Sequence, residues 1–450
     1  MNPLNIPELN LPRVVIIGGG FGGINLAEAL RHEPVQVVMF DKNNYHTFQP
    51  LLYQVATGGL EPDSIAFPLR KLFKGAERFH FRMAEVKEID PVNQIVFTNL
   101  GDIHADFIVV ATGSKTNFFG NAELEARCQG MKNIPEALDL RSLILQNFEA
   151  ALLEEDISKR EGLMNFVVVG GGPTGVETAG ALAELKKHIL PSDYPELDLR
   201  RMQIHLVEAG PRLLSSMSLE ASQKASRDLK KMGVHIWLNT KVLNYDSQFV
   251  QIEGNKNLPA KTVIWSAGVT ANPVAGSSKE YISSMRIPVD EFNRVKGESV
   301  VFAVGDVAGM KTKEYPDSHP MVAQPAIQQG KHLAGNILNL IYKKPLIPFK
   351  YKDLGSMATV GRNKAVADIM GFKFGGRIAW IMWMGVHLFS LAGFRNKLVV
   401  FINWFWSYIT YDRGTRLIIR PFRRKNGGGP GKGKIGIENP LAEPDKISMN

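Results

Sequence analysis

The sequence predicts an α/β fold with two Rossmann-like dinucleotide-binding domains and a C-terminal membrane-attachment region of amphipathic helices. Two units made of a strand, a glycine loop and a helix predict the two domains, and they begin near residues 13 and 165. A tryptophan-rich apolar stretch at residues 376–411 predicts the attachment region. The composition, with 44% hydrophobic and 22% charged residues, is that of an ordinary folded protein.

The first unit opens with an uninterrupted apolar run at residues 14–17, which predicts a buried parallel strand. A GxGxxG loop and a helix follow, and a second apolar strand at 35–40 ends in an acidic residue. Glycines at this spacing permit a tight turn, let the backbone approach a pyrophosphate and let the helix pack closely on the strand. Helix N-terminal amides would hold the phosphates, and the acidic side chain would bind a ribose hydroxyl. These residues are Gly18, Gly20, Gly23 and Asp41.

Three features precede the second unit. His46, Phe48 and Tyr53 could line the ring end of a cofactor, or they could be packing aromatics with a surface histidine. The alternating pattern at 79–98 predicts hairpin strands. Residues 105–114 predict a buried strand whose small-residue turn lets the backbone approach a cofactor.

The second unit repeats the device after an amphipathic connecting helix predicted at 134–160. Its strand and helix occupy 165–185, and a further strand at 203–207 ends in an acidic residue 38 residues beyond the first glycine, because a proline-containing segment lengthens the connection. Two such units in one chain imply two nucleotides that face each other. The residues are Gly170, Gly172, Gly175 and Glu208, with Ala267 and Gly268 ending a later buried strand.

Asp306 follows an apolar strand, so it should lie where open α/β sheets bind ligands, although Gly-Asp could also be a simple turn. The helix at 320–338 carries Gln324, Gln328 and Gln329. These amides are either solvated or placed to bond a carbonyl at a flavin edge. No metal-ligand set is predicted.

The C-terminal region contains two apolar segments, 376–394 and 398–411, with four of the six tryptophans at 380, 383, 404 and 406. Tryptophan prefers the membrane interface, so we expect an in-plane pair of helices, with a basic flank at 413–425 on anionic lipid. A single span, a buried core and a dimer interface are the alternatives. A Gly- and Pro-rich tail at 426–450 is predicted to be disordered.

The net charge of +9 is concentrated near the C-terminus, which suits an anionic leaflet; nucleic acid is not expected, because no aromatic-interleaved motif accompanies the charge. Cys128 is the only cysteine, so a redox-active cysteine pair is excluded and a reducing compartment is favoured. No secretory signal is predicted. The expected domains are a first dinucleotide-binding domain in two parts (1–125 and 291–349), a second dinucleotide-binding domain with the connecting helix (126–290), a membrane-anchoring domain (350–425) and the tail.

The motifs GGGFGG (18–23), NYHTFQPLLYQVATGGL (44–60), GGGPTGVE (170–177), VGDVAG (304–309) and AQPAIQQGK (323–331) together resemble the type II NADH:quinone oxidoreductases, as does RNKLVVFINWFWSY near the C-terminus. The resemblance implies FAD on the first unit, NADH on the second, and ubiquinone or menaquinone reached from the membrane. It also implies a non-proton-pumping, monotopic enzyme of the respiratory chain. We expect a homodimer on the cytoplasmic face of the cell inner membrane.

The resemblance also implies roles for residues that spacing alone does not single out. Thr112 and Gly113 match backbone contacts to FAD, and Asp306 matches a flavin-side carboxylate. Glu177 matches a carboxylate near the nicotinamide, although an acid in the first turn of a helix is also stabilised by the macrodipole. The residues that match the quinone site are Gln324, Gln328 and Lys397.

The implied reaction is hydride transfer from NADH to the flavin, followed by transfer of two electrons to a quinone. Glu208 favours NADH over NADPH because a carboxylate repels a 2′-phosphate, and the nearby Arg212 could soften that preference. One alternative is a soluble NADH-dependent reductase of a small iron-sulfur or rubredoxin-type protein. Another is a membrane-bound NADH-sensing interaction protein.

Overall fold

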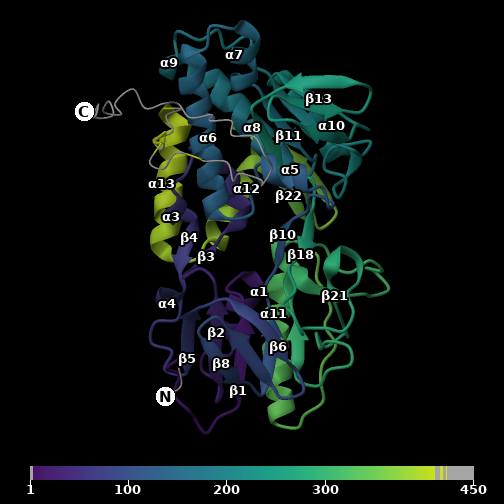
Figure 1. The fold of residues 1–450 in the computed structure, drawn as a ribbon. Coiled ribbons are helices and arrows are strands. Elements are labelled where there is room, and N and C mark those ends of the chain that lie inside the picture. The colour runs from purple at the N-terminus through teal and green to yellow at the C-terminus, as the bar shows by residue number, and fades with distance from the viewer. Residues whose placement is uncertain (1–3, 411–415, 419–421, 423–450) are drawn as a thin grey trace, which may run out of the picture.

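The computed structural model describes residues 4–410, 416–418 and 422. Its first sheet has five parallel strands in the order β20-β9-β1-β2-β5 and lies at the lower end of the molecule in Figure 1. The apolar run at the start of the chain forms the central strand, and every residue of it is buried, as in parallel sheets covered on both faces. The elements are β1 (Arg13–Ile17), α1 (Phe21–Ala29), β2 (Gln36–Asp41), β5 (Phe79–Met83), β9 (Phe107–Val110), β20 (Val301–Ala303) and α11 (Ala323–Ile341).

The second sheet has four parallel strands in the order β13-β12-β11-β17 and lies in the upper half of Figure 1. Val168 pairs with Leu206 on one side and with Ile264 on the other, so the first strand of this unit is also central. The predicted α/β fold with two dinucleotide-binding units is therefore confirmed. The elements are β11 (Phe166–Val169), α8 (Pro173–His188), β12 (Ile204–Val207), α10 (Leu219–Lys231), β13 (Val234–Trp237) and β17 (Thr262–Trp265).

Antiparallel strands connect and flank these two sheets. The pair β10 (Ser114–Thr116) and β18 (Val269–Ala271) links the two units. Ala271, Val274 and Ile287 belong to the apolar core of the first unit, although the predicted second domain extends to residue 290. The flanking sheets are β6 (Val86–Asp90), β7 (Ile95–Thr98) and β8 (Gly101–His104); β14 (Val242–Tyr245), β15 (Phe249–Ile252) and β16 (Lys256–Pro259); and the pair β19 (Ile287–Val289) and β21 (Ala308–Met310).

The prediction of hairpin strands across 79–98 is only half right. The strands β6 and β7 form a hairpin, but β5 is the edge strand of the first parallel sheet. Alternation arises there because an edge strand is more exposed than a central one. The short elements between these sheets are β3 (Tyr45–Thr47), α2 (Leu52–Ala56), α3 (Pro62–Ile65), β4 (Ala66–Pro68), α4 (Leu69–Leu72) and α5 (Ala122–Arg127).

The predicted single amphipathic helix at 134–160 is wrong, because two helices, α6 (Ile134–Leu153) and α7 (Ile157–Met164), occupy this part of the chain. Helix α6 is buried around much of its circumference, including the five consecutive residues 141–145. In Figure 1 it runs down the middle of the upper half of the molecule. Packing on several sides, which local periodicity does not report, therefore determines its environment.

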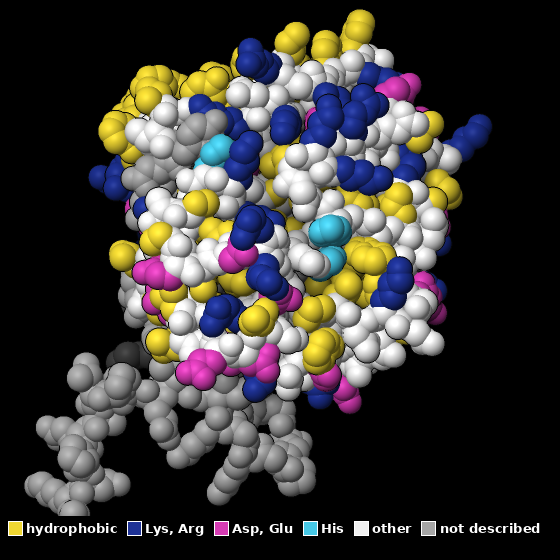
Figure 2. Space-filling model, turned by 90° about the horizontal axis from the view of Figure 1, so that it is seen from above, with side chains coloured by type: hydrophobic (Ala, Val, Ile, Leu, Met, Phe, Trp, Pro, Cys, Tyr) yellow, Lys and Arg dark blue, Asp and Glu magenta, His cyan; other side chains and the backbone are white. Residues whose placement is uncertain are grey.

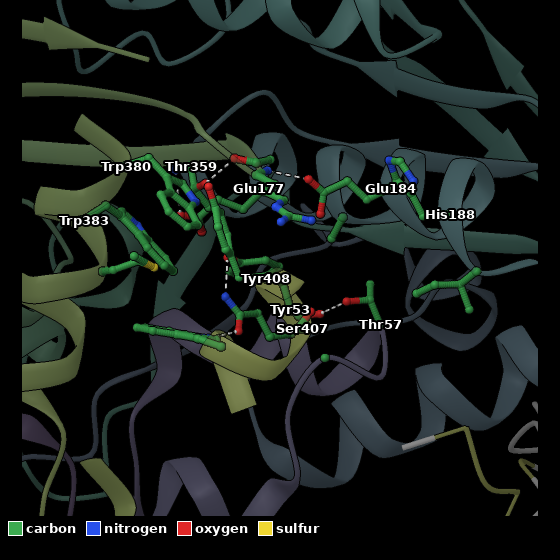
Figure 3. Close-up of a pocket in the computed structure, with 18 residues that line it drawn as sticks. Tyr53, Thr57, Glu177, Glu184, His188, Thr359, Trp380, Trp383, Ser407 and Tyr408 are labelled. Carbon is green, nitrogen blue, oxygen red and sulfur yellow. Dashed lines mark hydrogen bonds between the residues drawn. The ribbon is translucent and has the colours of Figure 1, made fainter. Parts of the chain in front are cut away.

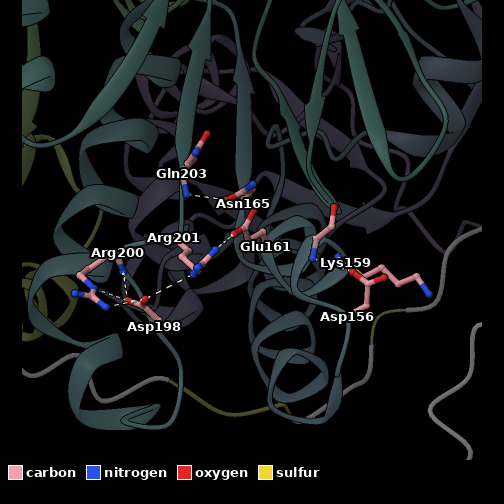
Figure 4. Close-up of polar contacts among 9 residues, drawn as sticks. Asp156, Lys159, Glu161, Asn165, Asp198, Arg200, Arg201 and Gln203 are labelled. Atoms are coloured by element: carbon pink, nitrogen blue, oxygen red, sulfur yellow. Dashed lines mark hydrogen bonds and ion pairs between the residues drawn. The ribbon is translucent and has the colours of Figure 1, made fainter.

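The long connection between α8 and β12 contains α9 (Leu190–Asp193) and a turn held by polar contacts (Figure 4). Asp198 accepts a 2.7 Å hydrogen bond from Arg200 Nε, and Arg201 forms a 2.6 Å ion pair with Glu161 on α7. Asn165 accepts from the backbone N–H of Gln203 at 2.7 Å, just before β12. These contacts fix the end of the insertion beside α7, and β12 then pairs in parallel with β11.

The C-terminal region consists of a three-stranded sheet and two helices that pack mainly on the second unit. Ala358, Val360 and Trp383 share one apolar core with α6 and α8. No helix within the described residues is long and apolar enough to cross a membrane. Apart from residues 416–418 and 422, the predicted basic flank and tail lie outside the described residues. The elements are β22 (Ser356–Gly361), β23 (Lys364–Ile369), β24 (Phe372–Gly375), α12 (Arg377–Ser390) and α13 (Phe394–Thr410).

Candidate functional site

The first glycine loop is a close-packed turn between β1 and α1. Gly18 has a φ of +113°, a conformation that disfavours residues with a Cβ. A Cβ built on Gly23 would lie only 1.9 Å from the carbonyl oxygen of Gly18, so any larger residue would push the helix off the strand. Asp41 accepts hydrogen bonds from the N–H groups of Gly19 at 2.6 Å and Asn43 at 2.7 Å. The loop and the acidic residue therefore form one rigid unit.

The second glycine loop repeats this geometry. Gly170 has a φ of +107°, and a Cβ built on Gly175 would again lie 1.9 Å from the carbonyl oxygen of Gly170. Glu208 accepts hydrogen bonds from the N–H groups of Gly171 at 2.5 Å and Gly210 at 2.6 Å. Since each carboxylate oxygen can accept more than one hydrogen bond, both acidic residues can still bind a ribose hydroxyl.

The predicted strand-end residues lie directly beside these loops. A Cβ built on Gly18 would lie 3.2 Å from the backbone nitrogen of Thr112, and one built on Gly170 would lie 2.7 Å from the Cα of Ala267. The side-chain hydroxyl of Thr112 is buried and has no hydrogen-bond partner in the described part of the chain. A buried hydroxyl without a partner beside this glycine loop fits a polar cofactor such as FAD in the first unit.

Asp306 lies at the carboxyl end of β20, as predicted, and it is embedded in a polar network. Ser114 Oγ donates a short hydrogen bond to its carboxylate, and Lys132 Nζ lies 3.9 Å away. Burial lowers the pKa of Lys132, although Asp306 opposes the shift. The preceding turn is held by Gln329, whose Oε1 accepts from the N–H of Gly305 at 2.7 Å. Sequence reasoning missed Ser114, Lys132 and Gln329 as partners because they are distant from Asp306 along the chain.

The two predicted quinone-site glutamines have different environments. Gln328 is held by the backbone of Lys352, to whose carbonyl it donates at 2.9 Å and from whose N–H it accepts at 3.0 Å. Gln324, at the N-terminus of α11, is half-buried, and its Oε1 lies 3.5 Å from Gln328 Nε2. Lys397 Nζ donates to the carbonyl of Phe389 at 2.8 Å, which caps the end of α12. Because the amide of Gln328 is already bonded to Lys352, Gln324 has the more available amide for a ligand.

His46 is not the surface histidine that one of our interpretations expected. It is buried, and its Nδ1 lies 3.0 Å from the carbonyl oxygen of Gly19. Burial lowers its pKa to about 4, so the ring is neutral at pH 7. Phe48 contacts Phe21 edge-on at 5.9 Å and His387 of α12 at 6.0 Å. These rings connect the first glycine loop to the C-terminal helices by packing.

Glu177 lines a pocket of about 110 Å³ between α2, α8, the β22–β23 turn, α12 and α13 (Figure 3). We call it the α8 pocket. Glu177 is 7% exposed, and burial raises its pKa to about 8, although the N–H of Thr359 donates to it at 3.3 Å. The carboxyl group is therefore mostly protonated at pH 7. The macrodipole alternative is wrong, because the first turn of α8 contains no acidic residue.

The tryptophans of the C-terminal helices line this pocket more than they face outward. Trp383 is only 2% exposed, and its indole N–H makes no hydrogen bond of ordinary geometry within the described residues. Trp404 donates to Gln54 Oε1 of α2 at 2.8 Å, and Arg362 stacks over Tyr408 at 4.0 Å. The prediction that all four tryptophans sit at a membrane interface is wrong for Trp383 and Trp404, because their rings pack against elements that are distant in sequence.

On the sides of α12 and α13 that face away from the α8 pocket, many apolar side chains are exposed. By contrast, the end of the molecule seen in Figure 2 mixes apolar, basic and acidic side chains, as an ordinary solvent-facing surface does. A concentration of apolar residues on two neighbouring helices indicates a surface that binds lipid or protein. The exposed residues are Ile378, Ile381, Val386, Phe389, Phe394, Leu398, Phe401, Ile402, Phe405, Trp406 and Ile409.

Comparison with known proteins agrees with this architecture. Residues 12–330 match the pyridine nucleotide-disulphide oxidoreductase family, and residues 354–411 match the NDH2 C-terminal domain. The chain is 36% identical over 436 residues to the type II NADH:quinone oxidoreductase Ndh of Mycobacterium tuberculosis, with 92% of each chain covered. It is 29% identical to a probable NADH dehydrogenase of Dictyostelium discoideum, with 88% of this chain and 89% of the relative covered.

Solved structures share the fold. NDH2 from Plasmodium falciparum in complex with NADH has a TM-score of 0.84 at 20% identity, with 91% of this chain and 100% of that chain covered. The sulfide:quinone oxidoreductase of Aquifex aeolicus has a TM-score of 0.69 at 20% identity, with 88% and 94% covered.

Proposed function

The chain belongs to the type II NADH:quinone oxidoreductases, and from that premise we propose that it transfers hydride from NADH to FAD and then two electrons to a quinone, without pumping protons. The observation that carries the proposal is the duplicated device of a glycine loop and a fixed acidic residue, repeated with the same contacts at Gly19–Asp41 and Gly171–Glu208. Two dinucleotides bound by one chain can exchange hydride between their rings.

The first unit is where we place FAD. Gly18, Gly20 and Gly23 would hold the pyrophosphate, Asp41 the ribose, and Thr112 with Gly113 the backbone contacts near the ring. Asp306 would lie on the flavin side, where Lys132 and Ser114 keep its carboxylate in position. When bound, FAD supplies the hydride acceptor and the electron carrier.

The second unit is where we place NADH, and two contacts support a preference over NADPH. Glu208 is fixed by two backbone N–H groups, so it cannot easily turn away from a 2′-phosphate. Arg212, which could have softened the preference, donates instead to the carbonyls of Ser215 at 2.6 Å and Met217 at 2.8 Å. Its guanidinium is thereby committed to the loop before α10.

We place the quinone between the α11 N-terminus and the α8 pocket. Gln324 offers an amide to a quinone carbonyl. The resemblance implies a position near the nicotinamide for Glu177, but its carboxyl group lines the α8 pocket, so we propose that it offers a proton to the quinone in a water-poor environment. Gln328 and Lys397 would support this site indirectly, Gln328 by fixing the segment at Lys352 and Lys397 by capping α12. Part of the pocket wall comes from α12 and α13, the same helices that carry the exposed apolar side chains, which supports a lipid-soluble acceptor at this site.

We further propose that the exposed apolar faces of α12 and α13 lie on the cytoplasmic face of the cell inner membrane and that the protein is a homodimer. The presence of a single cysteine, Cys128, fits a reducing compartment. A soluble reductase of small iron-sulfur proteins would have no use for that exposed apolar surface. The domain boundaries expected from the sequence remain part of this proposal, with the contacts of Ala271 and Ile287 favouring an earlier end to the second domain.

The test is NADH oxidation by the purified protein on liposomes that contain ubiquinone or menaquinone. We expect a yellow protein whose flavin is bleached by NADH and reoxidised by quinone in stopped-flow absorbance. A colourless protein, or a bleached flavin that quinone does not reoxidise, would refute the proposed function.

A further inference from the structure

The short loop between β10 and α5 is fastened to the nucleotide side of the second sheet. Trp265 Nε1 at the end of β17 donates to the carbonyl of Asn117 at 2.8 Å, and the N–H of Asn117 donates to the carbonyl of Gly268 at 3.2 Å. The side chain of Asn117 then accepts from the N–H of Phe119 at 2.8 Å. The position of Phe119 is therefore determined by the strand end that carries Gly268.

Phe119 has an unfavourable backbone conformation and an exposed ring. The backbone φ of this residue is +53°, in the left-handed region that disfavours residues with a Cβ, and the side chain is 68% exposed. Phe118 already anchors the loop by packing against Trp265, with ring centroids 5.4 Å apart. An exposed aromatic ring on a left-handed backbone, beside a residue that already provides the packing, indicates a function other than folding.

The ring also stands next to the second glycine loop. Its Cζ would lie 3.4 Å from a Cβ built on Gly268, and a Cβ built on Gly170 would lie 2.7 Å from the Cα of Ala267. Glu208 follows β12 on one side of the central strand β11, whereas Gly268 follows β17 on the other. A dinucleotide whose adenosine ribose binds Glu208 and whose pyrophosphate binds the loop therefore extends its nicotinamide half toward β17.

We propose that Phe119 is a positioning residue that packs its ring against the nicotinamide half of the dinucleotide. The inference rests on the proposed function, and it adds a residue that the glycine fingerprint does not contain. An aromatic ring contributes contact area with few rotatable bonds, so it orients a planar ligand at low entropic cost. Glu208 would thus fix one end of the nucleotide and Phe119 the other.

The test compares Phe119→Ala with wild type by calorimetric titration of the oxidised, FAD-containing protein. The ligands are NAD+ and ADP-ribose, which lacks the nicotinamide ring. We expect the Kd for NAD+ to rise about three- to tenfold, as for loss of one aromatic contact, with no change for ADP-ribose. Phe119→Tyr, which keeps an aromatic ring at this position, should bind NAD+ with the Kd of wild type. Phe97→Ala, which removes a 37% exposed ring from β7 in the first unit, is the matched control and should change neither Kd.

Two outcomes would overturn the role of Phe119. Unchanged NAD+ affinity would show that the ring does not contact the nicotinamide half, and an equal loss for both ligands would show that the substitution only disturbs the loop. Wild-type protein that binds neither ligand would instead overturn the proposed function, and the role of Phe119 with it. A rise in the KM for NADH without a rise in the KM for quinone provides a second readout.

Discussion

The buried carboxyl group of Glu177 makes a quantitative prediction about stability and pH. Its pKa is about 8 in the folded protein and 4.5 in an exposed glutamate, because burial disfavours the charged form. Between these two pH values the folded state keeps a proton that the unfolded state releases. The stabilisation that this bound proton contributes is therefore complete below pH 4.5. It is lost as the pH rises from 4.5 through 8, at about 1.4 kcal/mol per pH unit for this one group.

The perturbation is Glu177→Gln, which preserves shape and removes the titration. Over the interval between the two pKa values, the loss of unfolding free energy in wild type sums to about 5 kcal/mol. This value is an upper bound, because the side chain is still 7% exposed to solvent. We expect the variant to unfold with a much flatter dependence of Tm on pH than wild type, and to become the more stable protein near pH 8. The Glu184→Gln variant, on the same helix face but half-buried, is the control.

The assay is thermal unfolding followed by flavin fluorescence and by circular dichroism between pH 5 and 9, with wild type and both variants in the same detergent. The informative quantity is the difference in slope between wild type and Glu177→Gln, because the other ionisable groups of the protein cancel in it. Parallel pH profiles for these two proteins would refute the conclusion that Glu177 is neutral in the native state.

Three further predictions concern binding. Gly175→Ala puts a methyl group 1.9 Å from a carbonyl oxygen, so calorimetry should show at least a tenfold loss of NAD+ affinity while the protein stays yellow; a colourless variant would contradict the assignment of FAD to the other loop. Glu208→Gln should raise the NADPH-to-NADH ratio of kcat/KM about tenfold, since it removes one charged hydrogen bond and the repulsion of a 2′-phosphate. Arg212→Ala should leave that ratio unchanged, because its guanidinium already binds carbonyls. Phe405→Asp should reduce co-sedimentation with anionic liposomes about tenfold or more, because an acidic side chain partitions poorly into lipid. Leu153→Asp, at an exposed position on α6, should not; equal losses in the two variants would argue against α13 as the lipid contact.

Much of the fold was predictable because its signals are local. The strand β1 reads as an unbroken apolar run, and the glycine spacing from Gly18 to Gly23 determines how closely α1 packs on it. The same rules apply again at Gly170, so two nucleotide units followed from the sequence, and the limits of β1, β2 and β12 differ from the predicted ones by one residue at most. The position of a strand at the edge of a sheet is not a local signal, so the alternating pattern at 79–98 predicts a hairpin where β5 is in fact the edge strand of the parallel sheet.

The residues of the candidate site also fall into two groups, those set by local sequence and those set by long-range packing. Glycine loops and the acidic residues that follow the next strand are set by chain geometry over a few dozen residues, and the sequence alone was enough to identify them. What depends on long-range packing was not available: Thr359 reaches Glu177 across 182 residues, and Trp404 reaches Gln54 across 350. Burial of Glu177, the inward turn of Trp383 and the anchoring of Gln328 on Lys352 are all consequences of such contacts. Local sequence thus determined which nucleotides the chain is built to hold, whereas only the tertiary structure decided which side chains surround the proposed acceptor site, because burial and pKa are properties of neighbours that the sequence order does not reveal.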